Sequence, residues 1–136
     1  MSWVVDTCVL IDIAEGDPQF GRRSARLLDQ RRSAGLLVAP VSYIELAPRF
    51  RGMETAQQEF LEAIGVNWTD SWIWPDTLVA HKAWFAYRLK RGRGQITKRP
   101  IADILIGAFA SRFDGLLTRN TKDFRALFPD LRMEAP

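Results

Sequence analysis

The sequence predicts an α/β fold: a central, mainly parallel sheet of four to five short strands flanked by helices. Short apolar runs bounded by glycine, proline or a charge alternate along the chain with longer segments of helical pattern. Of the 136 residues, 47% are hydrophobic and 26% are charged, which is typical of globular proteins. Because no repeat, linker or low-complexity segment interrupts the pattern, residues 1–136 are expected to form a single domain.

The first half of the chain predicts three strands and three helices. Strands are expected at residues 3–6, 36–39 and 66–68, and helices at residues 18–33, 42–50 and 53–64. Thr7 and Cys8 look like the opening of a further helix directly after the first strand. In the helix from residue 42, Ser42 is the expected N-cap and Glu45 follows three residues later, the spacing of a capping box.

The second half predicts a long helix over residues 76–91, ending at Gly92, then a glycine-rich loop closed by Pro100. Residues 101–113 are nearly all apolar, and "GLLTR" is the fourth strand. Thr121 is expected to cap a last short helix that ends before Pro129.

Composition excludes several kinds of site. The chain has no apolar run near the roughly 18 residues that would span a bilayer, and no secretory leader, so a cytoplasmic location is the default expectation. A single cysteine and a single histidine cannot form an internal disulfide or a zinc site of Cys/His type. Any bound metal would therefore have oxygen ligands.

Charge is unevenly distributed. The net charge is +3, yet residues 77–102 contain seven basic residues and no acid. Such a strip attracts a polyanion, although a solvated helix face running into a basic loop explains it equally well. If nucleic acid binds there, the expected contacts to backbone phosphates come from Arg91, Arg93, Lys98 and Arg99.

Two acids are expected at the carboxyl edge of the sheet, where sites form in open α/β folds. Asp6 ends the first strand, and Glu45 lies near the start of the helix after the second. Each has a structural alternative, because Asp6 could be only an N-cap and Glu45 only the acid of a capping box.

Two further segments place oxygen side chains at the same edge. Asp103 is the single acid of an apolar helix, and its alternative role is to complement the helix dipole. Asn120 and Asp123 follow the fourth strand, where they could serve as a turn and a first-turn acid. Carboxylates gathered at one place repel each other unless a cation holds them, and oxygen ligands suit Mg²⁺ or Mn²⁺.

The segments "VVDTCVLID", "SYIEL", "IADILIGAFA" and "LLTRNTKDF" resemble the four signature segments of the PIN domain, in their usual order. The match covers nearly the whole chain. Its small size and the "TRNxxDF" form resemble most closely the VapC-type toxins of bacterial toxin–antitoxin pairs.

The resemblance implies a PIN-like nuclease domain: an Mg²⁺- or Mn²⁺-dependent ribonuclease that hydrolyses phosphodiester bonds, is neutralised by a cognate antitoxin and forms a homodimer. It implies catalytic roles for Asp6, Glu45, Asp103, Asn120 and Asp123, with metal contacts from Asp6, Asp103, Glu45 and Asp123. Either Asn120 or Asp123 would complete the site. Thr7 and Thr118 would support it, whereas Cys8 departs from the usual Asn or Ser, which puts a supporting polar contact in question.

Other interpretations stay open at this point. A non-catalytic RNA-binding α/β module would explain the basic strip and leave the acids as caps. An aspartyl-phosphate phosphotransferase would want a second Asp where Cys8 stands, and a nucleotide-binding domain would want a glycine-rich loop after the first strand. Trp68, Trp72 and Trp74 could stack on bases, but core packing or a dimer face is favoured. An antitoxin groove is expected near Leu46 and Phe60.

Overall fold

The computed structural model describes residues 2–92 and 100–136. The strands are β1 (Trp3–Val5), β2 (Leu36–Leu37), β3 (Val66–Asn67), β4 (Gly115–Leu117) and β5 (Met133–Glu134). The α-helices are α1 (Thr7–Glu15), α2 (Gly21–Arg31), α3 (Pro40–Glu45), α4 (Glu54–Ala63), α5 (Trp74–Gly92), α6 (Ile101–Ala110) and α7 (Thr121–Leu127). Two 3-10 helices, η1 (Arg32–Ala34) and η2 (Ala47–Phe50), follow α2 and α3.

The strands form one parallel sheet in the order β3-β2-β1-β4-β5. The first strand of the chain is therefore the middle strand of the sheet, with Trp3 paired to Leu36 on one side and to Gly115 on the other. All three residues of β1 are buried, as expected for an apolar run between two neighbours. The predicted α/β fold with a parallel sheet is confirmed.

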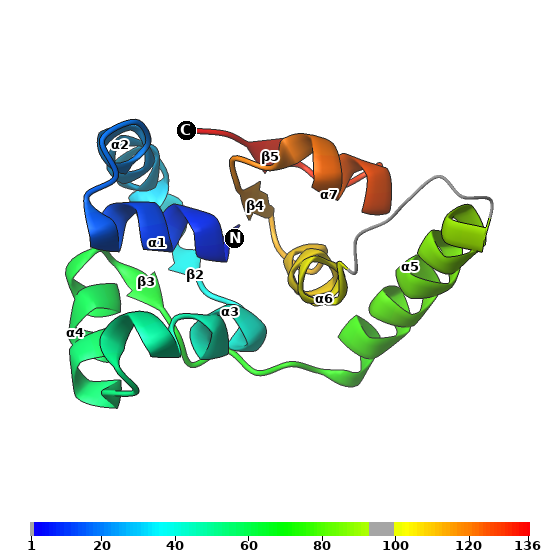
Figure 1. The fold of residues 1–136 in the computed structure, drawn as a ribbon, viewed down its shortest axis with the longest axis horizontal. Helices are drawn as coiled ribbons and strands as arrows, with labels where there is room; N and C mark the ends of the chain where they lie inside the picture. Colours follow the sequence, from blue (N-terminus) through cyan, green and yellow to red (C-terminus); the bar gives the residue numbers. More distant parts are fainter. Residues whose placement is uncertain (1, 93–99) are drawn as a thin grey trace.

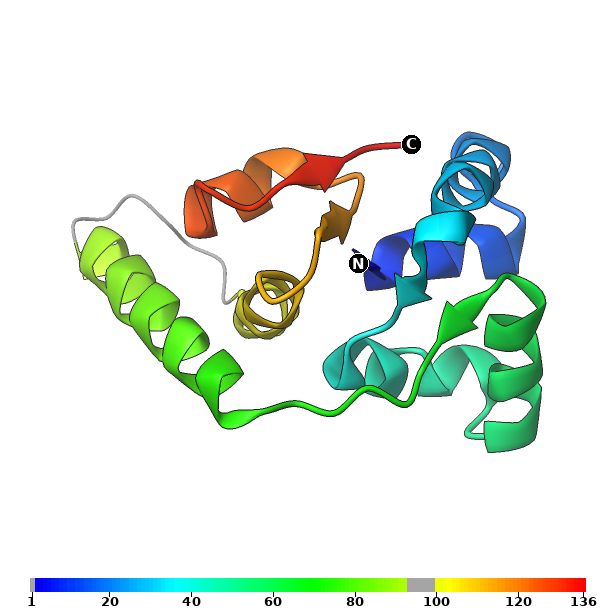
Figure 2. The ribbon, with the colours of Figure 1, turned by 180° about the vertical axis from the view of Figure 1, so that it is seen from behind.

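Helices cover both faces of the sheet (Figure 1). Val4 points into one apolar core together with side chains of α5, α6 and α7, while Trp3 and Val5 point into a second core with α1, α2 and α4. This alternation is the period-2 pattern of a strand covered on both faces. Seen from behind, α5 lies outside α6 as an outer layer (Figure 2).

The carboxyl edge of the sheet collects the starts of several helices. α1 begins directly after β1, α3 after β2 and α7 after β4. α6 leads into β4, so its last turn lies near the amino edge and its first turn, with Asp103, lies toward the carboxyl edge. Parallel topology thus directs the four predicted segments to one edge.

Several predicted helix boundaries were wrong. α3 begins at Pro40 rather than Ser42, because proline's fixed φ suits the first helical position and its missing N–H costs nothing there. The long helix α5 begins at Trp74, two residues earlier than expected. Thr121 is the first residue of α7 and not its cap, since Asn120 occupies the N-cap position without a capping side-chain bond.

Across the two described ranges, no helix is both long enough and apolar enough to cross a membrane.

Candidate active site at the carboxyl edge of the sheet

Asp6 is held at the end of β1 by three donors. Its Oδ1 accepts a hydrogen bond from the Thr7 backbone N–H (2.8 Å), so Asp6 is the N-cap of α1. Its Oδ2 accepts from the Thr118 hydroxyl (2.7 Å) and from the Cys8 thiol (3.2 Å). The cap interpretation is therefore correct but incomplete, because one oxygen caps the helix and the other is engaged by two further side chains.

Burial dominates the electrostatics of Asp6. Only 3% of the residue is exposed, and this desolvation raises the pKa of its carboxyl above the ordinary value. The hydrogen bonds from Thr118, Cys8 and Thr7 and the positive charge of Arg119 oppose that rise in pKa without cancelling it. A carboxylate in this position is stabilised by any additional positive charge nearby.

Thr7 connects α1 to α3. Its Oγ1 lies 2.7 Å from Oε1 of Glu45 and 2.8 Å from Oγ of Ser42. Because a hydroxyl has one proton and a carboxylate only accepts, the Thr7 proton goes to Glu45. The capping-box interpretation of Ser42 and Glu45 was wrong. Ser42 is buried inside α3, and Glu45 is the last residue of the helix, where it faces Thr7.

Cys8 and Thr118 connect β1 to the segment after β4. The Asn120 backbone N–H donates to Thr118 Oγ1 (3.0 Å), and the Asn120 side-chain amide lies 3.9 Å from Cys8 Sγ. The polar contact that the cysteine put in question is present, because its thiol donates to Asp6. Desolvation, followed by the charge of Asp6, raises the pKa of the Cys8 thiol to about 12, so the thiol keeps its proton.

The structure thus links five of the predicted residues by hydrogen bonds in which either side chains or backbone N–H groups donate: Asp6, Thr7, Glu45, Thr118 and Asn120. Asp103 is half-buried in the first turn of α6, and Asp123 is exposed in the first turn of α7. Within residues 2–92 and 100–136, no three His, Cys, Asp or Glu side chains are close enough to hold a metal ion. The predicted metal and catalytic roles therefore stay predictions.

Sequence reasoning missed the ion pair beside this site. The Arg119 guanidinium contacts both carboxylate oxygens of Asp12, with Nε 2.7 Å from Oδ2 and an amino nitrogen 3.2 Å from Oδ1. The Asp12 side chain is 5% exposed, and the guanidinium also lies 4.7 Å from the centre of the Phe20 ring. An acid between Ile11 and Ile13 in an apolar helix was the available signal for a buried partner.

The predicted phosphate contacts Arg93, Lys98 and Arg99 lie outside the described residues, as does the side chain of Arg91.

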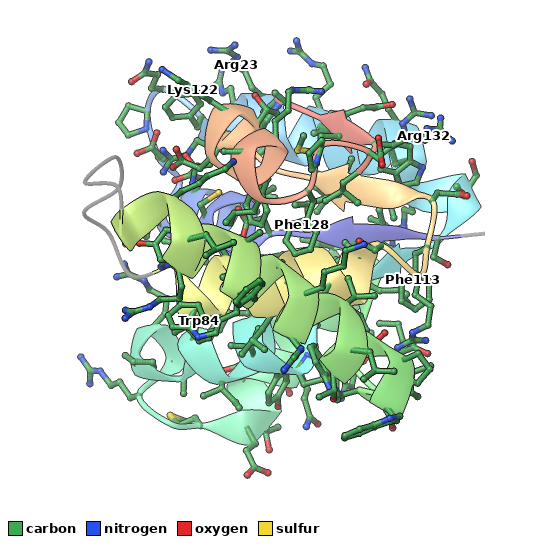
Figure 3. All side chains as sticks on the ribbon, turned by 90° about the vertical axis from the view of Figure 1, so that its right-hand side faces the viewer. Arg23, Trp84, Phe113, Lys122, Phe128 and Arg132 are labelled. Carbon is green, nitrogen blue, oxygen red and sulfur yellow. The ribbon has the colours of Figure 1, made fainter. Side chains whose placement is uncertain are left out.

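Of the tryptophans, Trp68 and Trp72 are half-buried and Trp74 is exposed. Leu46 is fully buried in a core and Phe60 is half-buried, and the antitoxin groove expected near them stays a prediction. A hollow of about 610 Å³ lies between α5 and the end of α7, and Phe113 and Phe128 belong to its apolar lining (Figure 3).

Comparison with solved structures identifies the fold. The structure matches VapBC2 from Rickettsia felis bound to a DNA fragment from the promoter (TM-score 0.67, 17% identity) over 99% of this chain and 98% of that one. It also matches VapBC-1 from nontypeable Haemophilus influenzae (TM-score 0.66, 20% identity), again over 99% and 98% of the two chains. FitAcB from Neisseria gonorrhoeae matches over 98% and 96% (TM-score 0.63, 20% identity).

The chain has the PIN fold. No family model matches the sequence, and no curated protein is similar enough in sequence to match. At 17–20% identity the likeness extends to the backbone from end to end and says nothing about individual side chains. The resemblance to PIN domains noted in four short segments is confirmed for the fold, and the linked residues lie at the carboxyl edge of its parallel sheet, where open α/β folds form their sites.

Proposed function

We propose that this protein is a metal-dependent endoribonuclease, the toxin of a type II toxin–antitoxin pair. The observation that carries the proposal is the buried Asp6 carboxylate at the end of the central strand, linked through one network to the carboxylate of Glu45 and to Asn120. A helix cap would need only one carboxylate oxygen and no second acid. Burying the Asp6 carboxylate away from water lowers the stability of the fold. Such buried, perturbed carboxylates are typical of functional sites, whereas a structural cap can stay exposed.

The donor set fits a hard divalent cation. Asp6, Glu45, Asp103 and Asp123 supply carboxylate oxygens and Asn120 an amide oxygen, whereas the single thiol is protonated and directed at Asp6. Such oxygen ligands suit Mg²⁺ or Mn²⁺ rather than Zn²⁺. A cation beside Asp6 would also offset the desolvation that raises its pKa.

The roles of the chain's own residues follow from their contacts. When bound, the cation would supply water activation and neutralise charge on the phosphate. Asp6 and Asp103 would hold it, and Glu45, fixed by Thr7, would hold it or orient the attacking water. Thr118 keeps the Asp6 carboxylate in one orientation, and Asn120 or Asp123 would complete the site.

The partners of the protein are part of the same proposal. Two of the matched structures are VapBC toxin–antitoxin assemblies, one of them bound to promoter DNA, which supports a cognate antitoxin protein as the partner of this chain. A homodimer is supported by a different observation. Trp74, Leu78, Phe85 and Leu89 form an exposed apolar stripe on one face of α5, because their spacings of four and seven residues return to the same face.

A cleavage assay on cellular RNA tests the nuclease. Purified protein should cut RNA with Mg²⁺ or Mn²⁺ and should not cut it in EDTA. Asp103→Asn should reduce the rate by more than about 100-fold, since loss of outer contacts alone costs metalloenzymes about 10–100-fold. The matched control is Asp130→Asn, which changes an exposed acid after α7, near the opposite edge of the sheet.

The alternative, a non-catalytic RNA-binding module, makes the opposite prediction. No preparation would then cleave RNA with any divalent cation, and Asp103→Asn would bind RNA as the wild type does. Cleavage by Asp103→Asn at the wild-type rate would show that the metal-site assignment is wrong even if the protein is a nuclease.

A further inference from the structure

A group of cations gathers around Phe20 directly beside the candidate active site. The guanidinium carbon of Arg119 lies 4.7 Å from the centre of the Phe20 ring, and that of Arg23 lies 5.6 Å from the same centre. Arg119 stands between Thr118 and Asn120, two residues of the linked network. The ring therefore joins a basic side chain of α2 to the segment that follows β4.

The cations of this surface are largely available to a ligand. Arg22, Arg23 and Arg26 on α2 and Lys122 and Arg125 on α7 are exposed. Among the described residues, none of these five has an ion pair, whereas Arg119 is paired with Asp12. Asp17, the nearest acid in the sequence to Phe20, uses its carboxylate to accept from the backbone N–H groups of Gln19 and Phe20.

The exposed face of α2 that carries these arginines also borders a small hollow. A hollow of about 160 Å³ between α2 and the last residues of the chain is lined by Arg23, Arg26 and Gln30, with Ala135 and Pro136 opposite. Arg23 donates to the Pro136 carbonyl oxygen (3.2 Å), which leaves its remaining N–H groups to other acceptors. Guanidinium groups stacked on a ring or fixed at one nitrogen lose less conformational entropy when they bind a phosphate.

We propose that this surface, formed by Arg22, Arg23 and Arg26 of α2 with Arg119 and Lys122, binds the RNA backbone beside the candidate active site. It rests on the proposed nuclease function and adds a binding path that the predicted basic strip on α5 did not include. Contacts to phosphate supply affinity without reading sequence, so the surface is expected to hold RNA of any sequence.

The test is binding of a labelled single-stranded RNA in EDTA, where cleavage cannot interfere. The variants are Arg23→Gln and Lys122→Gln, alone and together. Each should weaken binding several-fold and reduce the slope of log K against log salt by about 0.7 for each phosphate that the protein no longer neutralises. Thermal unfolding should be nearly unchanged, because both side chains are exposed.

Arg132→Gln is the matched control. Arg132 also stacks on an aromatic ring, 5.4 Å from the centre of Trp3, but it immediately precedes β5 at the amino edge of the sheet. Figure 3 shows it at the right of the view, apart from Arg23 and Lys122. The control should bind RNA with the wild-type affinity and salt slope.

A DNA strand of the same sequence should lose as much affinity as RNA when Arg23 and Lys122 are changed.

Two results would overturn the inference without touching the nuclease. One is unchanged RNA binding by the double variant. The other is an equal loss of affinity in Arg132→Gln, which would mean that only the total charge of the protein matters. Failure of the nuclease proposal is seen separately, in the cleavage assay with Asp103→Asn.

Discussion

Cys8 is a hydrogen-bond donor in this site rather than a reactive thiol. Its raised pKa, about 12, keeps the sulfur protonated at neutral pH, and the S–H points at the carboxylate of Asp6. Thiolates react and thiols do not, so alkylating reagents should find Cys8 inert. The position needs a side chain that donates to Asp6, and a thiol meets that need.

At the residue scale, Asp6 makes stability depend on pH in a defined direction. Burial raises its folded-state pKa above the value of 3.8 for an unburied Asp, so the folded protein binds this proton more tightly than the unfolded chain does. The free energy of unfolding of the metal-free protein should therefore fall as pH rises from about 4 through the raised pKa. Asp6→Asn should remove this contribution and increase stability at pH 7, on the order of 1 kcal/mol.

Urea unfolding in EDTA between pH 4 and pH 8 measures this effect. The difference in unfolding free energy between Asp6→Asn and the wild type should grow with pH, and Mg²⁺ should reduce it by stabilising the wild type. Asp130→Asn, an exposed acid, is the control. A difference that is constant with pH, or that falls, would contradict the raised pKa.

Sequence reasoning identified site residues where one local pattern sufficed. Asp6 at a strand end was found in this way, whereas Thr118 was named only through the resemblance to the PIN domain. Ser42 and Arg119 were missed because their roles depend on partners from distant segments: Thr7, 35 residues away from Ser42, and Asp12, 107 residues away from Arg119. The hydrophobic periodicity of one segment cannot predict hydrogen bonds to a segment far away in the sequence.

At the scale of elements, α3 shows why the Ser-x-x-Glu pattern of a capping box predicted the wrong first residue of the helix. Ser and Glu three residues apart do form capping boxes, but Pro40 starts the helix earlier and moves both residues inward. Each side chain then meets Thr7 across the gap between α3 and α1. Helix packing, rather than capping, determines what Ser42 and Glu45 do.

The contact of α6 with α7 depends on a glycine. A Cβ atom on Gly107 would collide with the ring of Phe128, which follows α7 and lines the groove beside α5. Gly107→Ala should destabilise the protein by about 1–3 kcal/mol through overpacking, although alanine is the better helix former by about 1 kcal/mol.

Denaturant unfolding of three variants checks the explanation. Gly107→Ala should lower the midpoint. Adding Phe128→Leu should restore part of the loss, while Phe128→Leu alone should be destabilising. Two single losses that simply add in the double variant would mean that the ring and the new methyl group do not collide.

At the scale of the whole molecule, the sequence predicted the alternation of strands and helices but not the order of strands. β5 is two residues long and was not assigned, because Met133 and Glu134 do not form an apolar run of the kind that marked β2. Its pairing with β4 is a property of the assembled sheet. The outer position of α5 likewise follows from packing on α6, which the helical period of α5 does not reveal.

The exposed stripe on α5 predicts self-association of the whole molecule. Phe85 is 62% exposed and Trp74 is 68% exposed. A continuous exposed stripe of large apolar side chains is unusual on a monomeric protein. The protein should be dimeric, and Phe85→Gln should raise the dissociation constant of the dimer at least about tenfold, since burial of one Phe contributes about 1.5–3 kcal/mol.

Sedimentation equilibrium over a range of concentrations provides the measurement. Lys90→Gln is the control, because Lys90 is exposed on the same helix but lies off the stripe. A wild-type protein that stays monomeric at every concentration would contradict this role for the stripe. So would a dimer that Phe85→Gln leaves as strong as before.

The central place of β1 also governs when the contacts of Asp6 form during synthesis. Asp6 is made near the beginning, yet Thr118, which orients its carboxylate, is added 112 residues later. A nascent chain halted before β4 would carry Asp6 and Glu45 but no partner strand on one side of β1. Translation must therefore be almost complete before these contacts form, and under the proposed function truncated products of this reading frame should not cleave RNA.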